Sequence, residues 1–312
     1  MHKILTITLN PSVDKSTSVA SLQPDKKLRC AAPILEPGGG GINVARVLHR
    51  FGDNVLPVFF AGGPCGDQFI GLLKAEGLPV SPVGIAGATR ENLHLTEEAS
   101  GRQYRLVMPG PEISADERQA ILRVIASQAK GAGFMVLSGS NPEGIPAAFL
   151  EQLAKIARQE KTLLVADISG EGLKQILKAG VYLIKPNLGE LARLTGKEEL
   201  SEAEAIAASR EIIAAGGSEI VVVSMGAAGA IMVSAQQVEK IQAPVVKKLS
   251  TVGAGDSMVA GIVHALSRGS DHPDAVRFGI ACGTAATMRA GTGLCRKTDA
   301  EHLYQLLRSE EK

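Results

Sequence analysis

The sequence predicts an α/β fold, a doubly wound and mostly parallel sheet with helices on both faces and a small β-sheet lid. Between residues 111 and 223, short apolar strands alternate with helical segments, which is typical of a parallel sheet covered on both sides. Two β-rich stretches, at about 12–36 and 89–108, do not fit this alternation. No low-complexity linker separates them from the rest. We therefore expect them to pair as a lid inserted into a single domain of residues 1–312.

The first half of the chain supplies the lid and the start of the sheet. Residues 4–9 form a β-rich run that Asn10 and Pro11 stop. Apolar residues recur at helical spacing over 42–51, and Gly52 is a suitable residue to end that helix. The other elements expected here are an extended segment at 27–35, a strand at 55–60, a helix at 67–76 and a hairpin of 92–97 with 103–107.

Two helices in the second half begin with capping boxes. Ser114 with Glu117 starts a helix that runs to about residue 130, and Ser201 with Glu204 starts one that ends at Gly216. The longest uncharged stretch, 220–238, is broken by glycines and polar residues, so we interpret it as strand, turn and strand rather than as a membrane span. The remaining expected elements are strands at 134–137, 163–166 and 181–184 and helices at 146–159, 171–179 and from 254 onward.

The composition excludes several classes of function. Lys and Arg number 33 against 32 Asp and Glu, and aromatic residues make up 3% of the chain, which disfavours nucleic-acid binding. The hydrophobic fraction of 45% is ample for a core. The amino-terminal apolar run is too short for a signal peptide, and the four cysteines form no C-x-x-C pair. The six histidines are scattered, so we expect no zinc site. We expect a cytoplasmic protein with reduced thiols and small-molecule ligands, without a nucleic-acid or membrane partner.

The segment 250–257 carries the clearest chemical signal. Gly253, Ala254 and Gly255 allow a tight turn at the start of a predicted helix, where free N–H groups bind anions. Asp256 lies in the same turn and is placed to accept a proton from a hydroxyl that attacks a phosphoryl group. The alternative is that Asp256 merely caps the helix.

Three further polar positions suit a sugar ligand. Asn43 follows a block of four glycines, 38–41, that lacks the third glycine of the dinucleotide fingerprint. Asp14 and Ser138 each follow a predicted strand, where ligands of open α/β sheets bind. Each position also has a structural interpretation. The glycine block before Asn43 would be a flexible turn that leads into a helix, Asp14 would form an Asx turn, and Ser138 would lie in a strand-to-helix turn.

Other motifs remain open between a functional and a structural interpretation. Asn187 and Glu190 lie one helical turn apart, which suits water-mediated Mg²⁺ binding or a capping box. The segment 224–229 either holds a nucleotide or forms a hairpin turn. Basic residues of the predicted lid suit a phosphate on the ligand or are simply solvated; they are Lys27, Arg29, Arg90 and Arg105.

In this order, the motifs resemble those of the ribokinase-like, PfkB-type carbohydrate kinases. The glycine block with Asn43, Ala45, Gly52 and Gly62 is similar to the first signature of the family, and 250–257 is similar to the second. Asn187 and Glu190 match its N-x-x-E element, and the resemblance covers essentially the whole chain. The segments 27–30, 38–46 and 103–110 most resemble the bacterial 6-phosphofructokinase branch. Gly40 stands where 1-phosphofructokinases and tagatose-6-phosphate kinases carry Lys, which favours that branch without deciding it.

The resemblance implies ATP-dependent transfer of a phosphoryl group to the C1 hydroxyl of fructose 6-phosphate, giving fructose 1,6-bisphosphate. Tagatose-6-phosphate kinase, 1-phosphofructokinase, a nucleoside kinase and a non-catalytic sugar-phosphate sensor remain alternatives. The family also implies a dimer through the lid, and a second ATP site with inhibition and tetramers at excess ATP. Asp256 would be the general base, with Gly253, Ala254 and Gly255 as the anion hole. The implied sugar-phosphate residues are Ser12, Asp14, Lys27, Gly39, Gly40, Asn43, Arg90, Arg105 and Ser138.

The resemblance also implies sites for ATP and two cations. ATP would be held by Lys185, Asn187, Ser224, Gly226 and Gly229. Glu190 would help to place Mg²⁺, and K⁺ would lie near Ser250, Val252, Ala286 and Gly291. Many members of the family carry Asp at the position of Ser250, so the cation dependence of this chain is open.

Overall fold

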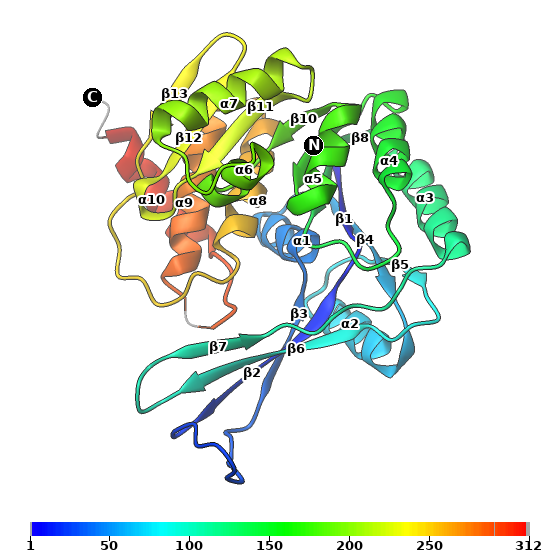
Figure 1. Cartoon of the computed structure of the whole chain (residues 1–312), viewed down its shortest axis with the longest axis vertical. Helices are drawn as coiled ribbons and strands as arrows, with labels where there is room; N and C mark the ends of the chain where they lie inside the picture. Colours follow the sequence, from blue (N-terminus) through cyan, green and yellow to red (C-terminus); the bar gives the residue numbers. More distant parts are fainter. Residues whose placement is uncertain (1, 290, 310–312) are drawn as a thin grey trace.

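The chain forms a nine-stranded sheet between two layers of helices, and a four-stranded lid extends away from it (Figure 1). This computed structural model describes residues 2–289 and 291–309. The main sheet has the strand order β13-β12-β11-β10-β9-β8-β1-β4-β5. Its strands are β1 (Lys3–Thr8), β4 (Val55–Ala61), β5 (Ser81–Gly84), β8 (Ala132–Ser138), β9 (Leu163–Asp167), β10 (Val181–Ile184), β11 (Ser218–Ser224), β12 (Ala230–Ser234) and β13 (Val238–Ile241).

The prediction of a mostly parallel sheet is confirmed. From β5 to β11 every neighbouring pair is parallel, and only the pairs β11–β12 and β12–β13 are antiparallel, so β12 alone runs against the other strands. The central strands are mostly apolar because helices cover both faces. One layer contains α1 (Gly40–Phe51), α2 (Gly63–Ala75), α8 (Ala254–Ser267), α9 (His272–Thr287) and α10 (Lys297–Ser309). The other contains α3 (Ala115–Ala129), α4 (Ala147–Gln159), α5 (Gly170–Ala179), α6 (Leu188–Leu194) and α7 (Glu202–Ala214).

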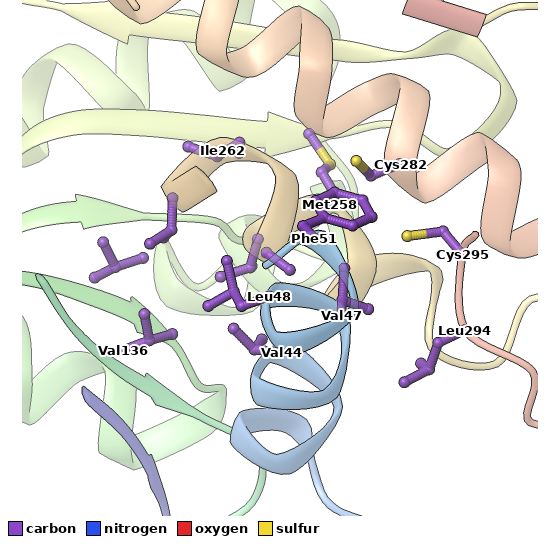
Figure 2. Close-up of a cluster of buried hydrophobic side chains, with 14 of the residues drawn as sticks. Val44, Val47, Leu48, Phe51, Val136, Met258, Ile262, Cys282, Leu294 and Cys295 are labelled. Carbon is purple, nitrogen blue, oxygen red and sulfur yellow. The ribbon is translucent and has the colours of Figure 1, made fainter. Parts of the chain in front are cut away.

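The packing of α1 against α8 matters most for the site. Figure 2 shows Val44, Leu48 and Phe51 of α1 in one buried cluster with Met258 and Ile262 of α8. The amino-terminal ends of these two helices carry the two glycine-rich motifs. Because interiors are close-packed, this cluster fixes the two motifs relative to one another.

The lid is a second sheet with the order β3-β2-β6-β7. Its strands are β2 (Ser12–Val19), β3 (Ile34–Gly38), β6 (Arg90–Glu97) and β7 (Gln103–Leu106). The two predicted lid stretches meet through parallel pairing of β2 with β6, and the predicted hairpin is the antiparallel pair β6–β7. Ser12 pairs with Arg90 where the lid joins the main sheet.

Some boundaries differ from the prediction. Both capping boxes are formed, and Gly52 ends α1 in the left-handed conformation with φ 85. However, α2 begins at Gly63 instead of residue 67, because Pro64 is compatible with a first helical turn. Of the extended segment predicted at 27–35, only residues 34 and 35 belong to a strand, β3; before them, Cys30 forms an isolated bridge with Val19 and Ala31 N donates to the Ser18 carbonyl at 2.9 Å. No helix in the described ranges is long and apolar enough to cross a membrane.

Candidate active site

Polar side chains gather at the carboxyl ends of the central strands, in front of the amino-terminal ends of α1 and α8. Asn43 of α1 donates a hydrogen bond from Nδ2 to Oδ2 of Asp256 in α8, at 2.8 Å. Ser138 ends β8, Asp167 ends β9 and Lys185 directly follows β10. This is the edge at which open α/β sheets bind ligands. The structure therefore brings together Asn43, Ser138, Lys185 and Asp256, as the sequence predicted.

Asp256 lies in the first turn of α8, which Gly253 opens with a φ of 71. Only glycine adopts this left-handed conformation readily, and it lets the chain turn so that the N–H groups of the first turn face outward. Asp256 is partly buried. Desolvation and the negative charge of Asp167 raise the pKa of Asp256 to about 6, against the opposing effects of Asn43 and Lys185. A carboxyl with such a pKa suits a general base near neutral pH.

Lys185 is the buried cation of the site. Its Nζ lies 3.1 Å from Oδ1 of Asp167, and a side chain at Gly255 would come within 3.5 Å of the same nitrogen. Burial alone would lower the pKa of Lys185, but Asp167, Glu190 and Asp256 raise it overall, so the ammonium stays charged. The cation thus lies beside the first turn of α8, where it adds to the positive field that favours an anion.

A second carboxylate, Asp14 of β2, faces the site from the lid. Its Oδ1 accepts hydrogen bonds from Ser12 Oγ at 2.7 Å and from Asn92 Nδ2 at 2.9 Å, and His94 Nε2 lies 3.8 Å from Oδ2. Burial would raise the pKa of Asp14, but the hydrogen bonds of His94, Ser12 and Asn92 lower it overall. The carboxylate is therefore ionised and able to accept hydrogen bonds from the hydroxyl groups of a ligand.

The glycine block approaches this group closely. A Cβ atom at Gly40 would lie 2.3 Å from Ser138 Oγ and 2.7 Å from the backbone nitrogen of Gly139. A larger residue at position 40 would therefore displace the Ser138 loop. The neighbouring Gly39 has a φ of 113, which few other residues adopt.

The predicted lid cations are not all in one place. Arg90 donates to the carbonyls of Asn10 at 3.0 Å and Met108 at 2.9 Å, and its buried Nε has no hydrogen-bond partner. Arg105 donates to Thr251 Oγ1 at 3.2 Å, which places it beside the 250–257 segment. The connection between β2 and β3 lies at the end of the lid away from the main sheet (Figure 1). Lys27 is exposed in this connection, within the loop that the Val19–Cys30 bridge closes. Within one chain, Lys27 is separate from the other site residues.

A cavity of about 370 Å³ adjoins the first turn of α8, and the lid carboxylate Asp14 is not among its lining residues. Ser224, Gly226 and Gly229 line it together with Ala254 and Gly255. The 224–229 segment also joins the antiparallel strands β11 and β12, with Met225 N donating to the Gly229 carbonyl at 2.8 Å. The segment is therefore a hairpin turn that also lines the cavity, so the two interpretations, a ligand loop and a hairpin turn, do not exclude one another.

Asn187 and Glu190 form the capping box of α6. Glu190 N donates to Asn187 Oδ1 at 2.9 Å and Asn187 N donates to Glu190 Oε2 at 3.0 Å. The structural alternative for this motif is thus present. The capping bonds use only one carboxylate oxygen of Glu190, which leaves Oε1 for a further ligand.

Three of the four predicted potassium positions also meet. Ser250 Oγ donates to the Gly291 carbonyl at 2.7 Å, and Val252 N donates to Ser250 Oγ at 3.2 Å. Ala286 is buried in the last turns of α9, next to Thr287, whose carbonyl accepts from Ser250 N at 3.2 Å. This neighbourhood of carbonyl oxygens is chemically suited to an alkali cation.

The sequence profile of the pfkB family carbohydrate kinases matches residues 4–299. The chain belongs to this family. It is 41% identical over 308 residues to ATP-dependent 6-phosphofructokinase isozyme 2 of Escherichia coli strain K12, covering 98% of this chain and 99% of that protein. It is 40% identical over 304 residues to the protein of the same name from Mycobacterium tuberculosis, covering 97% and 89% of the two chains.

Solved structures of pfkB kinases agree with the fold. The crystal structure of Escherichia coli phosphofructokinase-2 in complex with potassium superposes with a TM-score of 0.95 at 41% identity, over 99% of this chain and 100% of that one. Structures of that protein with fructose-6-phosphate and in a tetrameric inhibited form match with TM-scores of 0.93. Ribokinase of Thermotoga maritima, at 18% identity and a TM-score of 0.78, shares the fold. The ribokinase-like fold expected from the resemblance is therefore confirmed.

Sequence reasoning missed several residues of this pfkB site. Asp167 was not proposed, although it directly follows the predicted strand 163–166 at the same sheet edge as Ser138, and that position could have indicated it. Asn92 and His94 contact Asp14 only because β2 and β6 pair in parallel register, with Asp14 opposite Asn92. No local pattern in the sequence predicts that pairing.

Proposed function

We propose that this pfkB kinase is an ATP-dependent 6-phosphofructokinase, which phosphorylates the C1 hydroxyl of fructose 6-phosphate to fructose 1,6-bisphosphate. The observation that carries the proposal is the position of Asp256. It lies in an anion-binding helix turn whose residues Ala254 and Gly255 line a cavity of about 370 Å³, and the ionised lid carboxylate Asp14 is near enough to contribute to its raised pKa. The names of the relatives at 40% and 41% identity support the choice of substrate.

In the proposed reaction, Asp256 accepts the proton of the C1 hydroxyl as that oxygen forms a bond to the γ-phosphorus of ATP. The bond between the γ-phosphorus and the bridging oxygen breaks, and ADP leaves. The N–H groups of residues 253–256 and the Lys185 ammonium stabilise the negative charge on the moving phosphoryl group. Asp14 and Asn43 hold sugar hydroxyls, with Ser12 orienting Asp14 and Ser138 nearby. Arg90 and Arg105 serve the sugar phosphate.

The cation sites are part of the proposal. Glu190 Oε1 would hold Mg²⁺ through water, which suits an ion that keeps several waters and takes one or two carboxylates. Bound Mg²⁺ neutralises charge on the nucleotide phosphates. Carbonyl oxygens of the 250–252 segment, Ala286 and Gly291 would hold K⁺. Potassium in the structure of the Escherichia coli relative supports this assignment.

The test compares fructose 6-phosphate, tagatose 6-phosphate and fructose 1-phosphate as acceptors with MgATP, by ADP release. We expect kcat/KM to be highest for fructose 6-phosphate, because Gly40 leaves room for Ser138 and places no lysine in the glycine block. A preference for either other sugar would move the enzyme to another branch of the family. Absence of turnover with all three would favour the sensor or, if nucleosides react, a nucleoside kinase.

The pH dependence follows from the raised pKa of Asp256. The base must be ionised, so we expect kcat at saturating substrates to fall below a midpoint of about pH 6, in line with the pKa of Asp256. Asn43→Ala removes a hydrogen bond that lowers this pKa, so it should move the midpoint to higher pH. The phosphate of the substrate also titrates near pH 6, and its titration would not respond to Asn43. An unchanged midpoint in Asn43→Ala would argue against Asp256 as the titrating base.

We further propose one kinase domain that dimerises through the lid in the cytoplasm. The lid exposes large apolar side chains, of which Ile34 is 64% and Val107 is 63% exposed, and exposed apolar patches mark interfaces. The tetrameric inhibited form belongs to the Escherichia coli relative; for this chain, tetramers at excess ATP are a proposal.

A charge on the lid should disrupt this dimer. We expect Ile34→Asp to convert the dimer to a monomer, since burying an unpaired carboxylate in an interface is costly. Light scattering coupled to size-exclusion chromatography measures the mass. Leu163→Asp, at a 37% exposed residue of β9 on the main domain, is the matched control and should leave the mass unchanged. A dimer that persists in Ile34→Asp would place the interface elsewhere.

A further inference from the structure

The cavity next to the first turn of α8 has a chemically uniform lining. Its described side chains are mainly small or aliphatic: Ala227, Ala243, Pro244, Val245, Val246, Met258 and Ile280. Five lining residues carry a polar side chain: Ser224, Lys248, Thr251, Thr284 and Thr287. None of the described lining residues is Asp, Glu, Asn or Gln, so no lining side chain is a dedicated acceptor.

Most of these polar groups already have partners. Thr287 Oγ1 donates to the carbonyl of Thr284 at 2.7 Å, and Thr251 Oγ1 accepts from Arg105 at 3.2 Å. Ser224 Oγ lies 3.5 Å from the Pro186 carbonyl. The Thr284 hydroxyl can donate or accept, and the Lys248 ammonium can only donate. Neither group therefore selects an amino group over a carbonyl on a bound base.

Adenine and guanine differ at the edge of the base to which the Thr284 hydroxyl or the Lys248 ammonium would form hydrogen bonds. Adenine presents an amino donor at its six-position, whereas guanine presents a carbonyl acceptor there. Selection of adenine needs a fixed acceptor opposite the amino group. The main chain of 242–248 is the other source of acceptors, but this segment forms no helix or strand, so its carbonyls are not held in a regular ladder. Val245 within it is fully exposed, at 102%.

From this lining we infer that the phosphoryl donor site recognises a purine nucleoside triphosphate by its phosphates and the flat faces of its base, and accepts GTP and ITP as well as ATP. This inference deepens the proposed function and rests on its assignment of the cavity to the donor nucleotide. An apolar pocket discriminates between similar ligands by about 10- to 200-fold, whereas a site built to hydrogen-bond one group rejects analogues by about 10⁴- to 10⁵-fold. The ratio of kcat/KM for ATP to that for GTP therefore distinguishes an apolar base pocket from a pocket that hydrogen-bonds one particular base.

The experiment measures kcat/KM for MgATP, MgGTP and MgITP with saturating fructose 6-phosphate, with fructose 1,6-bisphosphate as the product detected. We expect GTP and ITP to lie within about 100-fold of ATP. A preference for ATP above about 10³-fold would overturn the inference and leave the proposed function standing. Absence of product with all three donors would overturn the proposed function. In that case calorimetry of MgADP and MgGDP binding tests the inference separately. MgADP binding more than about 10³-fold tighter than MgGDP would overturn it, and a smaller ratio would support it.

A pair of variants tests whether Thr284 reads the base. Thr284→Val removes the hydroxyl at similar size, and Thr284→Ser keeps it. We expect both variants to change kcat/KM for ATP and GTP by the same factor, so that the ratio of the two stays within about threefold of the wild-type ratio. A shift of the ratio above tenfold in Thr284→Val that Thr284→Ser restores would assign base reading to this hydroxyl and overturn the inference.

Discussion

Asp256→Asn is expected to lower kcat by about 10²- to 10⁴-fold, the usual contribution of a general base, with KM for fructose 6-phosphate changed only a few-fold. The amide of asparagine can still accept the hydrogen bond from Asn43, so the geometry of the turn should persist while the proton acceptor is lost. Steady-state kinetics with MgATP measures the effect. A kcat close to that of the wild type would contradict the assignment of Asp256 as the base.

A matched control separates catalysis from helix capping. Asp271 accepts the backbone N–H of Asp274 as the N-cap of α9, outside the site. Asp271→Ala removes this cap, so it should lower the melting temperature and leave kcat essentially unchanged. Asp256→Asn should instead lower kcat without lowering the melting temperature. The folded-state pKa of Asp256 is raised to about 6, so its ionisation opposes folding increasingly from about pH 4 to about pH 6. Asp256→Asn should therefore raise the melting temperature at pH 7, and this gain should disappear below about pH 4.

Arg90→Ala should raise KM for fructose 6-phosphate by about 10- to 100-fold, because a hydrogen bond to a charged group contributes roughly 1.5–3 kcal/mol. Arg90 is half-buried where the lid joins the sheet, and its buried Nε has no partner within the protein. Burial lowers the pKa of Arg90 and nearby Asp14 opposes this shift. A phosphate group on the ligand would supply the missing partner.

The design must distinguish phosphate binding from support of the lid, since Arg90 also bonds the carbonyls of Asn10 and Met108. Kinetics with unphosphorylated fructose makes this distinction. If Arg90 binds the phosphate, Arg90→Ala should leave kcat/KM for fructose at the wild-type value. If the substitution damages the lid, kcat/KM should fall by the same factor for fructose and for fructose 6-phosphate. Arg105→Ala should give a smaller rise in KM, because Arg105 is exposed. Arg102→Ala, on the exposed β6–β7 turn, is the control and should have no effect. An unchanged KM in Arg90→Ala would exclude the phosphate role.

The parts of the structure that local chemistry determines could be predicted from sequence. The capping boxes at Ser114 and Ser201 and the left-handed Gly52 are formed as expected, because each depends on residues within one turn. The 250–257 segment and Asn43 were singled out by their glycines and polar side chains as well as by the family resemblance, and the structure places Asn43 Nδ2 2.8 Å from Oδ2 of Asp256.

What the sequence could not supply depends on pairing between distant segments. Asp167 lies 3.1 Å from Lys185 because β9 and β10 are neighbours in the sheet, and Asn92 reaches Asp14 because the lid has one particular register. The position of Lys27 was also beyond prediction. A basic residue in the lid sequence suggests a phosphate ligand, but the exposed 20–33 connection carries Lys27 away from Arg90.

The parallel pairing of β2 with β6 has a consequence for the order of folding. Ser12 and Arg90, which open this pairing, are separated in the chain by β3, α1, β4, α2 and β5. Closing so long a loop costs conformational entropy before any lid contact compensates for it, and contacts of this kind form slowly. We therefore expect the β1–α1–β4–α2–β5 unit to assemble first and to hold both lid strands in register. A nascent chain that has not yet emerged beyond Leu106 cannot complete the lid, so β2 stays without its partner β6 until roughly the first third of the chain has been synthesised.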